Sequence, residues 1–463
     1  MSRAERAQVP QGGTSEASKG PAPRDRAARR VVITGLGVLA ANGNNVRDFE
    51  LAIRKGQSGI RVDENMREQG FGSHVAGVPQ GIDELAEALF DEDDLLAMNS
   101  GHRVASIAAL EAWEDAGLER PESGGDRVDW DTGTVFGTGI GGMDTIAAKI
   151  VPLTNAKKVR RLGSTAVEQV MASGISARLS GLLALGNQVT TNSSACSTGS
   201  EAISLGAERI RHGLAQRMLC GGAEGVSHYI WAGFDAMRVL CRKFNDAPER
   251  ASRPLSASAA GFVPAAGAGA LMLESLESAQ ERGARIHAEL LGSFVNCGGH
   301  RGGGSMTAPN PESVERCIRG ALADAGLESA AIGAINGHLT ATGADPKEVN
   351  SWARALDCGP ESLPPITSTK SMIGHGLGAA GAIEAVASVL MLRGFVHPSI
   401  NCEDVHPEIE PYAASIPHTL LEVPDLDVVI KAGFGFGDVN CCLVFRKWNE
   451  QSEPRSREAG PRD

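Results

Sequence analysis

Aromatic side chains are scarce in this sequence of 463 residues. Phe, Trp and Tyr together make up 4% of the chain, whereas glycine occurs 57 times. The overall balance, 42% hydrophobic and 22% charged, is that of an ordinary globular protein. Because small residues let helices and sheets approach closely, we expect several packed layers.

An excess of positive charge is also missing. Lys and Arg number 44 against 56 Asp and Glu, which gives a net charge of -12. A nucleic-acid-binding protein needs a dominant basic face, so we expect no nucleic-acid partner. Two local basic clusters nevertheless stand out, KKVRR at 157–161 and RK at 242–243.

The sequence carries no recognisable metal, disulfide or membrane signature. Its nine cysteines are scattered, without a Cys-x-x-Cys pair or a zinc-type Cys/His spacing, so we expect no metal and a reducing compartment. The first 30 residues lack the apolar segment of a secretion signal. The longest apolar run, 376–392, contains Glu384 and is too short and interrupted for a membrane span. We expect a cytoplasmic protein without a cofactor.

Strand-like and helix-like patterns alternate between residues 30 and 448, and the polar ends, 1–29 and 449–463, are expected to be disordered tails. Strands separated by helices predict βαβ units and mixed sheets, an α/β fold. The expected strands begin near residues 30, 132, 187, 217, 268, 286, 334, 427 and 441. The expected helices cover 102–116, 200–212, 311–325, 345–356 and 378–392.

Two of these helices, 200–212 and 378–392, carry small or apolar residues nearly all round. A helix without a polar face is buried on all sides, so both would fit between two sheets. The chain also restarts near residue 285, after the charged segment ESLESAQERGARI. We therefore predict two related halves, 30–280 and 281–448, stacked in five layers as α/β/α/β/α.

A lone cysteine, Cys196, follows a β-branched stretch and precedes a helix pattern in TTNSSACSTGSEAI, 190–203. If Cys196 starts this helix, the helix dipole and free N–H groups favour the thiolate, which is the nucleophilic form. The alternative is a buried, inert structural cysteine. The strand–cysteine–helix context, with Gly199 allowing close approach, makes a nucleophile as good a candidate as a structural cysteine.

Two histidines at similar strand ends are candidate partners of the cysteine: His338 in INGHLTATGAD and His375 in TSTKSMIGHGLGAAGAIE. Lys370 lies in TSTKSMIGH, which has no other charge and leads into a buried helix. A buried lysine needs a counter-charge, for which Asp345 and Glu348 are candidates. The alternatives are structural histidines, a surface lysine, and an acidic pair at a helix N-terminus.

Glycine and phenylalanine alternate in AGFGFGDVN, 432–440. Glycine permits close backbone approach and the rings can wall a cavity, so this segment can place a backbone N–H opposite Cys196 as an oxyanion hole. The alternative is a hydrophobic turn between two strands. A second glycine-rich run, VFGTGIGG at 135–142, lacks the spacing and the acidic residue of a dinucleotide loop, so no nucleotide cofactor is expected.

Five motifs, in this order along the chain, resemble those of the β-ketoacyl-acyl carrier protein synthases, the decarboxylating condensing enzymes of fatty acid and polyketide synthesis. They are SSACSTGSEAI, NDAPERASRP, NGHLTATGAD, TSTKSMIGHGLGAAGAIE and GFGFGDVN, and the match runs from about Val31 to Lys447. The resemblance implies the thiolase fold, acyltransferase activity and a homodimer. It also implies acyl- and malonyl-loaded acyl carrier protein as partner, with the two basic clusters as candidate docking sites.

The resemblance also implies catalytic roles. Cys196 matches the acyl-accepting nucleophile, and Lys370 matches the family's lysine. His338 and His375 match the histidines that bind the malonyl thioester carbonyl as neutral donors while carboxylate is lost. The resulting carbanion then attacks the acyl group on Cys196 and lengthens it by two carbons.

Five further residues take supporting roles by the same resemblance. Asp345 and Glu348 stand at the positions of the lysine's acidic partners. Phe436 matches the residue whose N–H joins that of Cys196 in the oxyanion hole and whose ring gates the acyl pocket. Thr340 and Thr342 match threonines that touch the phosphopantetheine arm.

Several positions depart from the family pattern: Leu339 and Ala341 stand where glycine is common, and Asp438 and Val439 replace Gly and Thr. These changes spare the nucleophile and both histidines, and they favour a specialised polyketide or lipid pathway. Two other functions remain open. A non-catalytic partner subunit of a heterodimeric ketosynthase would usually lack the cysteine, and a thiolase-like enzyme acting on coenzyme A thioesters is disfavoured by the two histidines.

Overall fold

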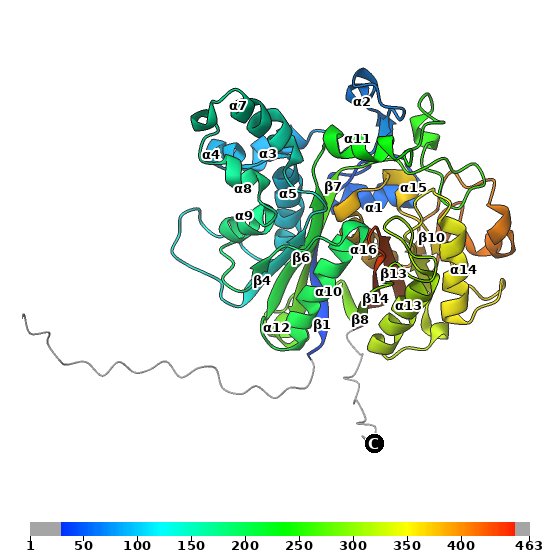
Figure 1. The fold of residues 1–463 in the computed structure, drawn as a ribbon. Helices are drawn as coiled ribbons and strands as arrows, with labels where there is room; N and C mark the ends of the chain where they lie inside the picture. The colour runs from blue at the N-terminus through cyan, green and yellow to red at the C-terminus, as the bar shows by residue number, and fades with distance from the viewer. Residues whose placement is uncertain (1–28, 450–463) are drawn as a thin grey trace, which may run out of the picture.

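The core of the molecule is one ten-stranded sheet made of two halves with the same strand order. The structure, a computed structural model, describes residues 29–449 (Figure 1). The order is β1-β7-β6-β4-β5 in the N-terminal half and β8-β14-β13-β9-β10 in the C-terminal half. In each half the first strand pairs antiparallel with the last, the last pairs antiparallel with the fourth, and the other two pairings are parallel. This repeated topology confirms the predicted duplication.

The two halves are joined edge to edge instead of forming separate sheets. The first strands, β1 and β8, pair over two residues each, Val32 with Glu289 and Ile33 with Ala288. The N-terminal strands are β1 (Val31–Leu39), β4 (Thr132–Gly137), β5 (Val189–Thr190), β6 (Arg217–Glu224) and β7 (Gly267–Ser275). The C-terminal strands are β8 (Ala288–Cys297), β9 (Ala334–Asn336), β10 (Ile366–Thr367), β13 (Val428–Gly435) and β14 (Val439–Lys447).

Helices complete five layers, in which the two β layers are the two halves of this one sheet. Figure 1 shows α5 (Ser100–Asp115) and α9 (Gly174–Leu183) outside one half, and α13 (Pro311–Ala325) and α14 (Asp345–Leu356) outside the other. Between the halves lie α10 (Thr198–Arg211) and α16 (Ala380–Met391). Every residue of α16 is buried, as a helix without a polar face requires.

The central helices approach the sheet and one another through glycine. A Cβ atom on Gly199 of α10 would lie 2.6 Å from the backbone N of Ala382 in α16. A Cβ on Gly269 of β7 would lie 2.4 Å from the carbonyl C of the same Ala382. The abundance of small residues therefore has a physical role here, because it brings the active-site ends of α10 and α16 together.

Long helices match the sequence prediction better than short elements do. The structure begins and ends α13 and α14 at the predicted residues, since each has Pro in its first turn and a left-handed residue, Gly326 or Asp357, after its last. The sequence patterns do not reveal the short elements: α1 (Val46–Arg54), α2 (Glu64–Glu68), α3 (Ile82–Leu89), α4 (Glu92–Ala97), α6 (Met143–Thr145), α7 (Val151–Asn155), α8 (Ala166–Val170), α11 (His228–Ala236), α12 (Leu276–Glu281), α15 (Lys370–Ile373), β2 (Arg61–Val62), β3 (Val75–Ala76), β11 (Phe395–Val396) and β12 (Leu421–Glu422).

Apart from Arg29 and Asn449, the two expected tails lie outside the described residues. Within 29–449, no helix combines the length and the apolar character needed to cross a bilayer.

Candidate active site

Cys196 lies in a single 3-10 turn, Ala195–Ser197, immediately before α10. Its side chain is buried, and the backbone N–H groups of Phe436 and of Cys196 itself bind the sulfur. Burial nevertheless raises the pKa of the thiol to about 11, because desolvation outweighs these N–H groups and the charge of Lys370. The expectation that the helix terminus lowers this pKa is therefore wrong.

His375 contacts the cysteine directly. Its Nε2 lies 3.0 Å from the Cys196 Sγ, and its Nδ1 accepts the backbone N–H of Leu377 at 3.3 Å. With Nδ1 occupied as an acceptor, the proton of the neutral ring belongs on Nε2, which then donates toward the sulfur. Burial and then the charges of Lys370 and Lys431 hold the pKa of His375 well below its usual value.

His338 stands beside His375, with the two ring centroids 5.4 Å apart in an edge-to-face arrangement. The Nζ of Lys370 lies 3.4 Å from the Nδ1 of His338 and donates to its carbonyl oxygen at 2.6 Å. A lysine donating to Nδ1 leaves the ring proton on Nε2, which is free to face a substrate. Burial, followed by the charge of Lys370, keeps the pKa of His338 well below normal. Both buried rings are therefore neutral, and each can present an Nε2–H group to a substrate oxygen.

The counter-charge of Lys370 differs from the prediction. Its Nζ forms a salt bridge with Glu384 of α16, not with Asp345 or Glu348. The carboxylate of Glu348 instead accepts the backbone N–H groups of His338 (2.6 Å) and Leu339 (2.9 Å). The predicted acids are wrong because the true partner, Glu384, lies on the helix that follows the lysine, where it looks like part of an apolar run.

Asp345 and Glu348 position the loop that carries His338. Asp345 accepts N–H groups from Leu255, Thr340 and Ala341 at 2.9–3.0 Å. Leu339 and Ala341 both have positive φ, 22° and 62°, at positions where glycine would be relaxed. The two buried carboxylates therefore hold a strained loop in place, and burial raises the pKa of Asp345 and raises that of Glu348 to about 7.

The side chains of Cys196, His338 and His375 meet in one cavity of about 570 Å³. Cys196, His338 and His375 each offer a heteroatom within 4.8 Å of the other two. The ring of Phe436 packs edge-on against Phe234, with 6.0 Å between centroids. The cavity wall also includes Phe436, Thr340, Thr342, Glu348 and Ile140.

A Cys/His/His set can in principle bind a metal ion, so its charge environment matters. Lys370 and Lys431 both act electrostatically on the two histidines. Burial raises the pKa of the Cys196 thiol to about 11, so the thiol is protonated at neutral pH. Two ammonium groups beside the ligands oppose a divalent cation and favour an anion instead. The set is therefore suited to stabilising developing negative charge.

Comparison with known proteins identifies the family of this site. The model of the beta-ketoacyl synthase N-terminal domain matches residues 28–279, and that of the C-terminal domain matches residues 287–403. The chain belongs to the β-ketoacyl synthase family. The 3-oxoacyl-[acyl-carrier-protein] synthase 1 of Haemophilus influenzae is 36% identical over 423 residues, which are 91% of this chain and 100% of the relative.

Solved structures agree with this assignment. A β-ketoacyl synthase from Burkholderia phymatum superimposes with a TM-score of 0.82 at 30% identity, covering 91% of this chain and 100% of the other. The complex of a type II PKS acyl-carrier protein with its ketosynthase bound to the hexaketide gives a TM-score of 0.80 at 29% identity, with the same coverage. The thiolase-like fold implied by the motifs is confirmed.

The glycine-rich run 135–142 of this β-ketoacyl synthase does not form an anion-binding loop. The carboxylate of Glu224 accepts the N–H groups of Gly139 (2.9 Å), Ile140 (3.4 Å) and Gly378 (3.0 Å). A phosphate would need those N–H groups, and the carboxylate would repel it. The run instead fixes Ile140 on the cavity wall.

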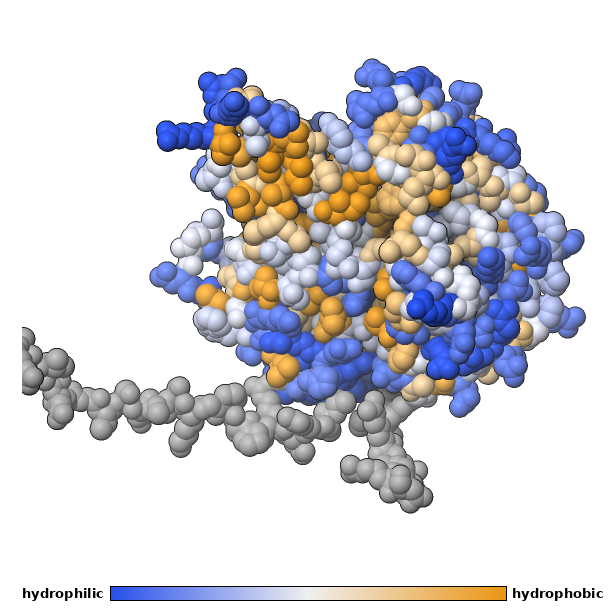
Figure 2. Space-filling view, in the orientation of Figure 1, coloured by the Kyte–Doolittle hydropathy of each residue, from blue (hydrophilic) through white to orange (hydrophobic). Residues whose placement is uncertain are grey.

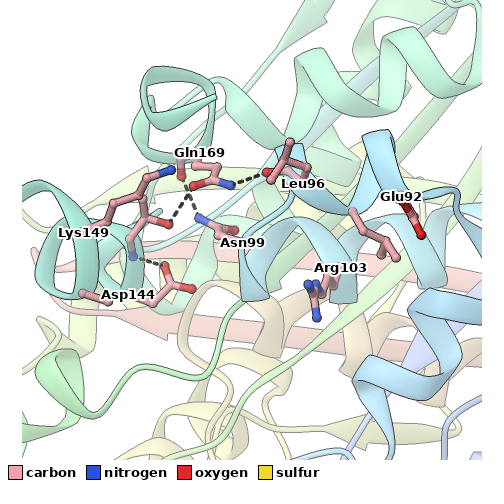
Figure 3. Close-up of a pocket in the computed structure, with 10 residues that line it drawn as sticks. Glu92, Leu96, Asn99, Arg103, Asp144, Lys149 and Gln169 are labelled. Carbon is pink, nitrogen blue, oxygen red and sulfur yellow. Dashed lines mark hydrogen bonds between the residues drawn. The ribbon is translucent and has the colours of Figure 1, made fainter. Parts of the chain in front are cut away.

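A second cavity, of about 580 Å³, lies between α4, α5 and the helices after β4 (Figure 3). Its polar side chains bind one another or the backbone: Asn99 donates to the Gln169 carbonyl at 2.6 Å, and Gln169 donates to the Leu96 carbonyl at 2.9 Å. No cysteine or histidine lines it. It therefore lacks the thiol and imidazole groups that meet in the first cavity.

Two charged residues of the site escape sequence reasoning. Glu384 interrupts an apolar helix. In the sequence this charge argues against a membrane span but does not indicate a role in the site. Lys431, on β13, is fully buried and lies 3.1 Å from the same Glu384 carboxylate. A lysine inside a strand of otherwise apolar and glycine residues is the signal that could have found it.

Proposed function

We propose that this β-ketoacyl synthase forms a carbon–carbon bond by decarboxylative condensation of malonyl-acyl carrier protein with an acyl chain held on Cys196. The observation that carries the proposal is the meeting of one thiol and two neutral imidazoles within 4.8 Å in a buried cavity. Thiols both attack and leave thioesters readily, and neutral imidazoles can donate to an oxygen that gains negative charge.

The reaction requires two bond exchanges. The Cys196 sulfur attacks the acyl thioester, the carrier sulfur leaves, and the thiol proton passes to it. Malonyl thioester then loses carbon dioxide, and its electron pair becomes an enolate whose oxygen accepts from the Nε2 atoms of His338 and His375. The enolate carbon attacks the acyl carbonyl, whose oxygen binds the N–H groups of Cys196 and Phe436. The carbon–sulfur bond breaks, and the Cys196 thiolate takes up a proton.

The proposal is tested with purified protein, acyl-carrier protein and malonyl-carrier protein. Mass spectrometry should detect a β-ketoacyl-carrier protein two carbons longer than the starting acyl group, together with carbon dioxide. Release of carbon dioxide without any lengthened product would favour the partner-subunit alternative. The intact Cys196, His338 and His375 support the active enzyme instead.

Acyl carrier protein is the proposed delivery partner, and the exposed basic cluster at 157–161 is its candidate docking site. Arg242, in the second cluster, is held by Asp235 at 3.1 Å and offers less free charge. Replacing Lys157, Lys158, Arg160 and Arg161 by Glu should raise KM for carrier-bound substrate and spare small acyl thioesters. As a control, Arg316 and Arg319, which are exposed on α13, are replaced by Glu. An unchanged KM for carrier-bound substrate would reject this docking site.

A homodimer is proposed on the edge of the N-terminal half. Strand β5 ends the strand order, and α8 packs on α9, which in turn packs on β5. On α8 the side chain of Val167 is 70% exposed, and Figure 2 shows hydrophobic surface on the lobe that carries α7 and α8. Val167→Asp should therefore convert dimer to monomer in light scattering, whereas a wild-type monomer would reject the proposal.

A cytoplasmic location is also proposed. All nine cysteines are unpaired, as in a reducing compartment. Fractionation of cells that produce the full chain tests this directly.

A further inference from the structure

Lys431 is a second buried ammonium group behind the two histidines. It projects from β13, has no exposed surface, and donates to the Ser200 hydroxyl of α10 at 2.5 Å. Its Nζ lies 3.1 Å from one oxygen of Glu384, and the Nζ of Lys370 binds the other oxygen. One carboxylate is thus shared by two lysines, which leaves a positive charge uncompensated.

Two glycines next to Lys431 leave room for its side chain. A Cβ atom on Gly381 would lie 3.3 Å from the Lys431 Nζ, and one on Gly433 would lie 3.4 Å from it. Both glycines therefore leave room for the ammonium between β13 and α16. A buried charge is costly unless it has a partner, so this arrangement needs a reason beyond packing.

We propose that Lys431 is a second cationic positioning residue, which by sharing Glu384 with Lys370 keeps positive charge beside His338 and His375 and so holds both rings neutral for oxyanion binding. The inference deepens the proposed condensation and rests on it for its catalytic meaning. A carboxylate paired with one lysine carries no net charge, whereas two lysines on one carboxylate leave a net positive charge that acts on the rings.

The other charges that face the two rings do not replace this effect. Lys370 approaches from α15, Glu384 from α16, and Glu348 from α14 through the backbone N–H of His338. Cys196 faces His375 as a thiol. Within the described residues, Lys431 is the charge on β13 that acts on both histidines, and it depresses the pKa of each.

A purely mechanical role for Lys431 is separable from this electrostatic one. The start of α10 is already bound to β13 without Lys431, because the Ser197 hydroxyl donates to the carbonyl of Gly433 at 2.9 Å. Ser200→Ala removes the hydrogen bond of Lys431 but keeps its charge. Lys431→Met keeps an unbranched side chain of similar length but removes the charge.

Histidine titration by NMR tests the proposal without relying on turnover. The protein is labelled at the histidine rings, and the His338 and His375 signals are assigned from their Asn variants. In Lys431→Met both rings should titrate at a higher pH than in the wild type, by about one unit. The acid limb of turnover should move up in pH with them, whereas Ser200→Ala should match the wild type in both measurements.

The outcomes separate the two proposals. Unchanged ring titration in Lys431→Met, or an equal shift in Ser200→Ala, would overturn the role of Lys431 whatever the enzyme makes. A shifted titration in a protein that forms no condensation product would support the role of Lys431 and reject the proposed function. If circular dichroism shows that Lys431→Met does not fold, Lys431→Gln, which retains a donor toward Ser200, is measured instead, with the same expected shift.

Discussion

The Nε2 of His375 lies 3.0 Å from the Sγ of Cys196, although 179 residues separate the two in sequence. The contact depends on the crossing of α10 and α16, since Cys196 precedes one helix and His375 the other. The active site is therefore a consequence of how closely these two buried helices pack.

The first prediction concerns that packing. Gly199→Ala places a Cβ 2.6 Å from the backbone N of Ala382, so α10 and α16 must separate. We expect the free energy of unfolding to fall by about 1–3 kcal/mol and turnover to fall with it. Urea denaturation and a condensation assay measure the two effects. Gly181→Ala, in α9 with nothing within 4 Å of the added Cβ, is the control and should be neutral or slightly stabilising. Equal behaviour of the two variants would contradict the packing argument.

The two histidines should have separable effects. His338 binds Lys370, whereas the sulfur is contacted by His375 and by the N–H of Phe436. In His338→Ala we therefore expect acyl transfer to Cys196 to persist while condensation slows by about 10²–10⁴-fold. Intact-protein mass spectrometry follows acylation, and product analysis follows condensation. Loss of acylation in this variant would show that the division of roles is wrong.

Glu384 should be the most sensitive single acid in the core. Glu384→Gln leaves Lys370 and Lys431 buried without their carboxylate. Breaking a buried ion pair on one side costs about 3–5 kcal/mol, so denaturant midpoints should fall strongly. In Glu312→Gln, where an exposed pair with Arg316 is lost, we expect less than about 1 kcal/mol. A small effect at Glu384 would mean that the lysines find other partners.

Acid should destabilise the fold through buried histidines outside the site. Burial lowers the pKa of both His102 and His397 to about 4, below their unfolded value of 6.5. Their unfolded forms bind more protons, so their contribution to stability is complete above about pH 6.5 and is lost progressively as the pH falls toward 4. Each unit of pKa difference corresponds to about 1.4 kcal/mol. Urea unfolding at pH 7 and pH 5 measures the loss, and His397→Asn should reduce it. If His397→Asn loses as much stability between pH 7 and pH 5 as the wild type, His397 does not contribute to the acid sensitivity.

Much of the fold could be predicted because long elements carry their own signals. The predicted bounds of α13 and α14 are correct because proline and left-handed residues mark their ends. Two-residue strands such as β5 and β10 exist only through pairing with β4 and β9, and no periodicity marks the π-helix at Ile146–Ile150.

The site was less accessible to sequence reasoning where burial or long-range contacts decide the outcome. Motif spacing marked Cys196, His338 and His375, and the structure brings all three together. The pKa of the Cys196 thiol was misjudged because desolvation depends on the whole surrounding fold. The sequence does not reveal the roles of Glu384 and Lys431, because the contacts of these residues with each other and with Lys370 are tertiary. These contacts join three separate elements, α15, α16 and β13.

The central claim is that Cys196 carries the growing chain. After incubation with acyl-carrier protein, trypsin cleavage at Arg178 and Arg209 releases a peptide whose one cysteine is Cys196. The account predicts the acyl mass on this peptide, its disappearance on addition of malonyl-carrier protein, and its absence in Cys196→Ala. Product formation with no acyl group on this peptide, or with the label on another cysteine, would contradict the account.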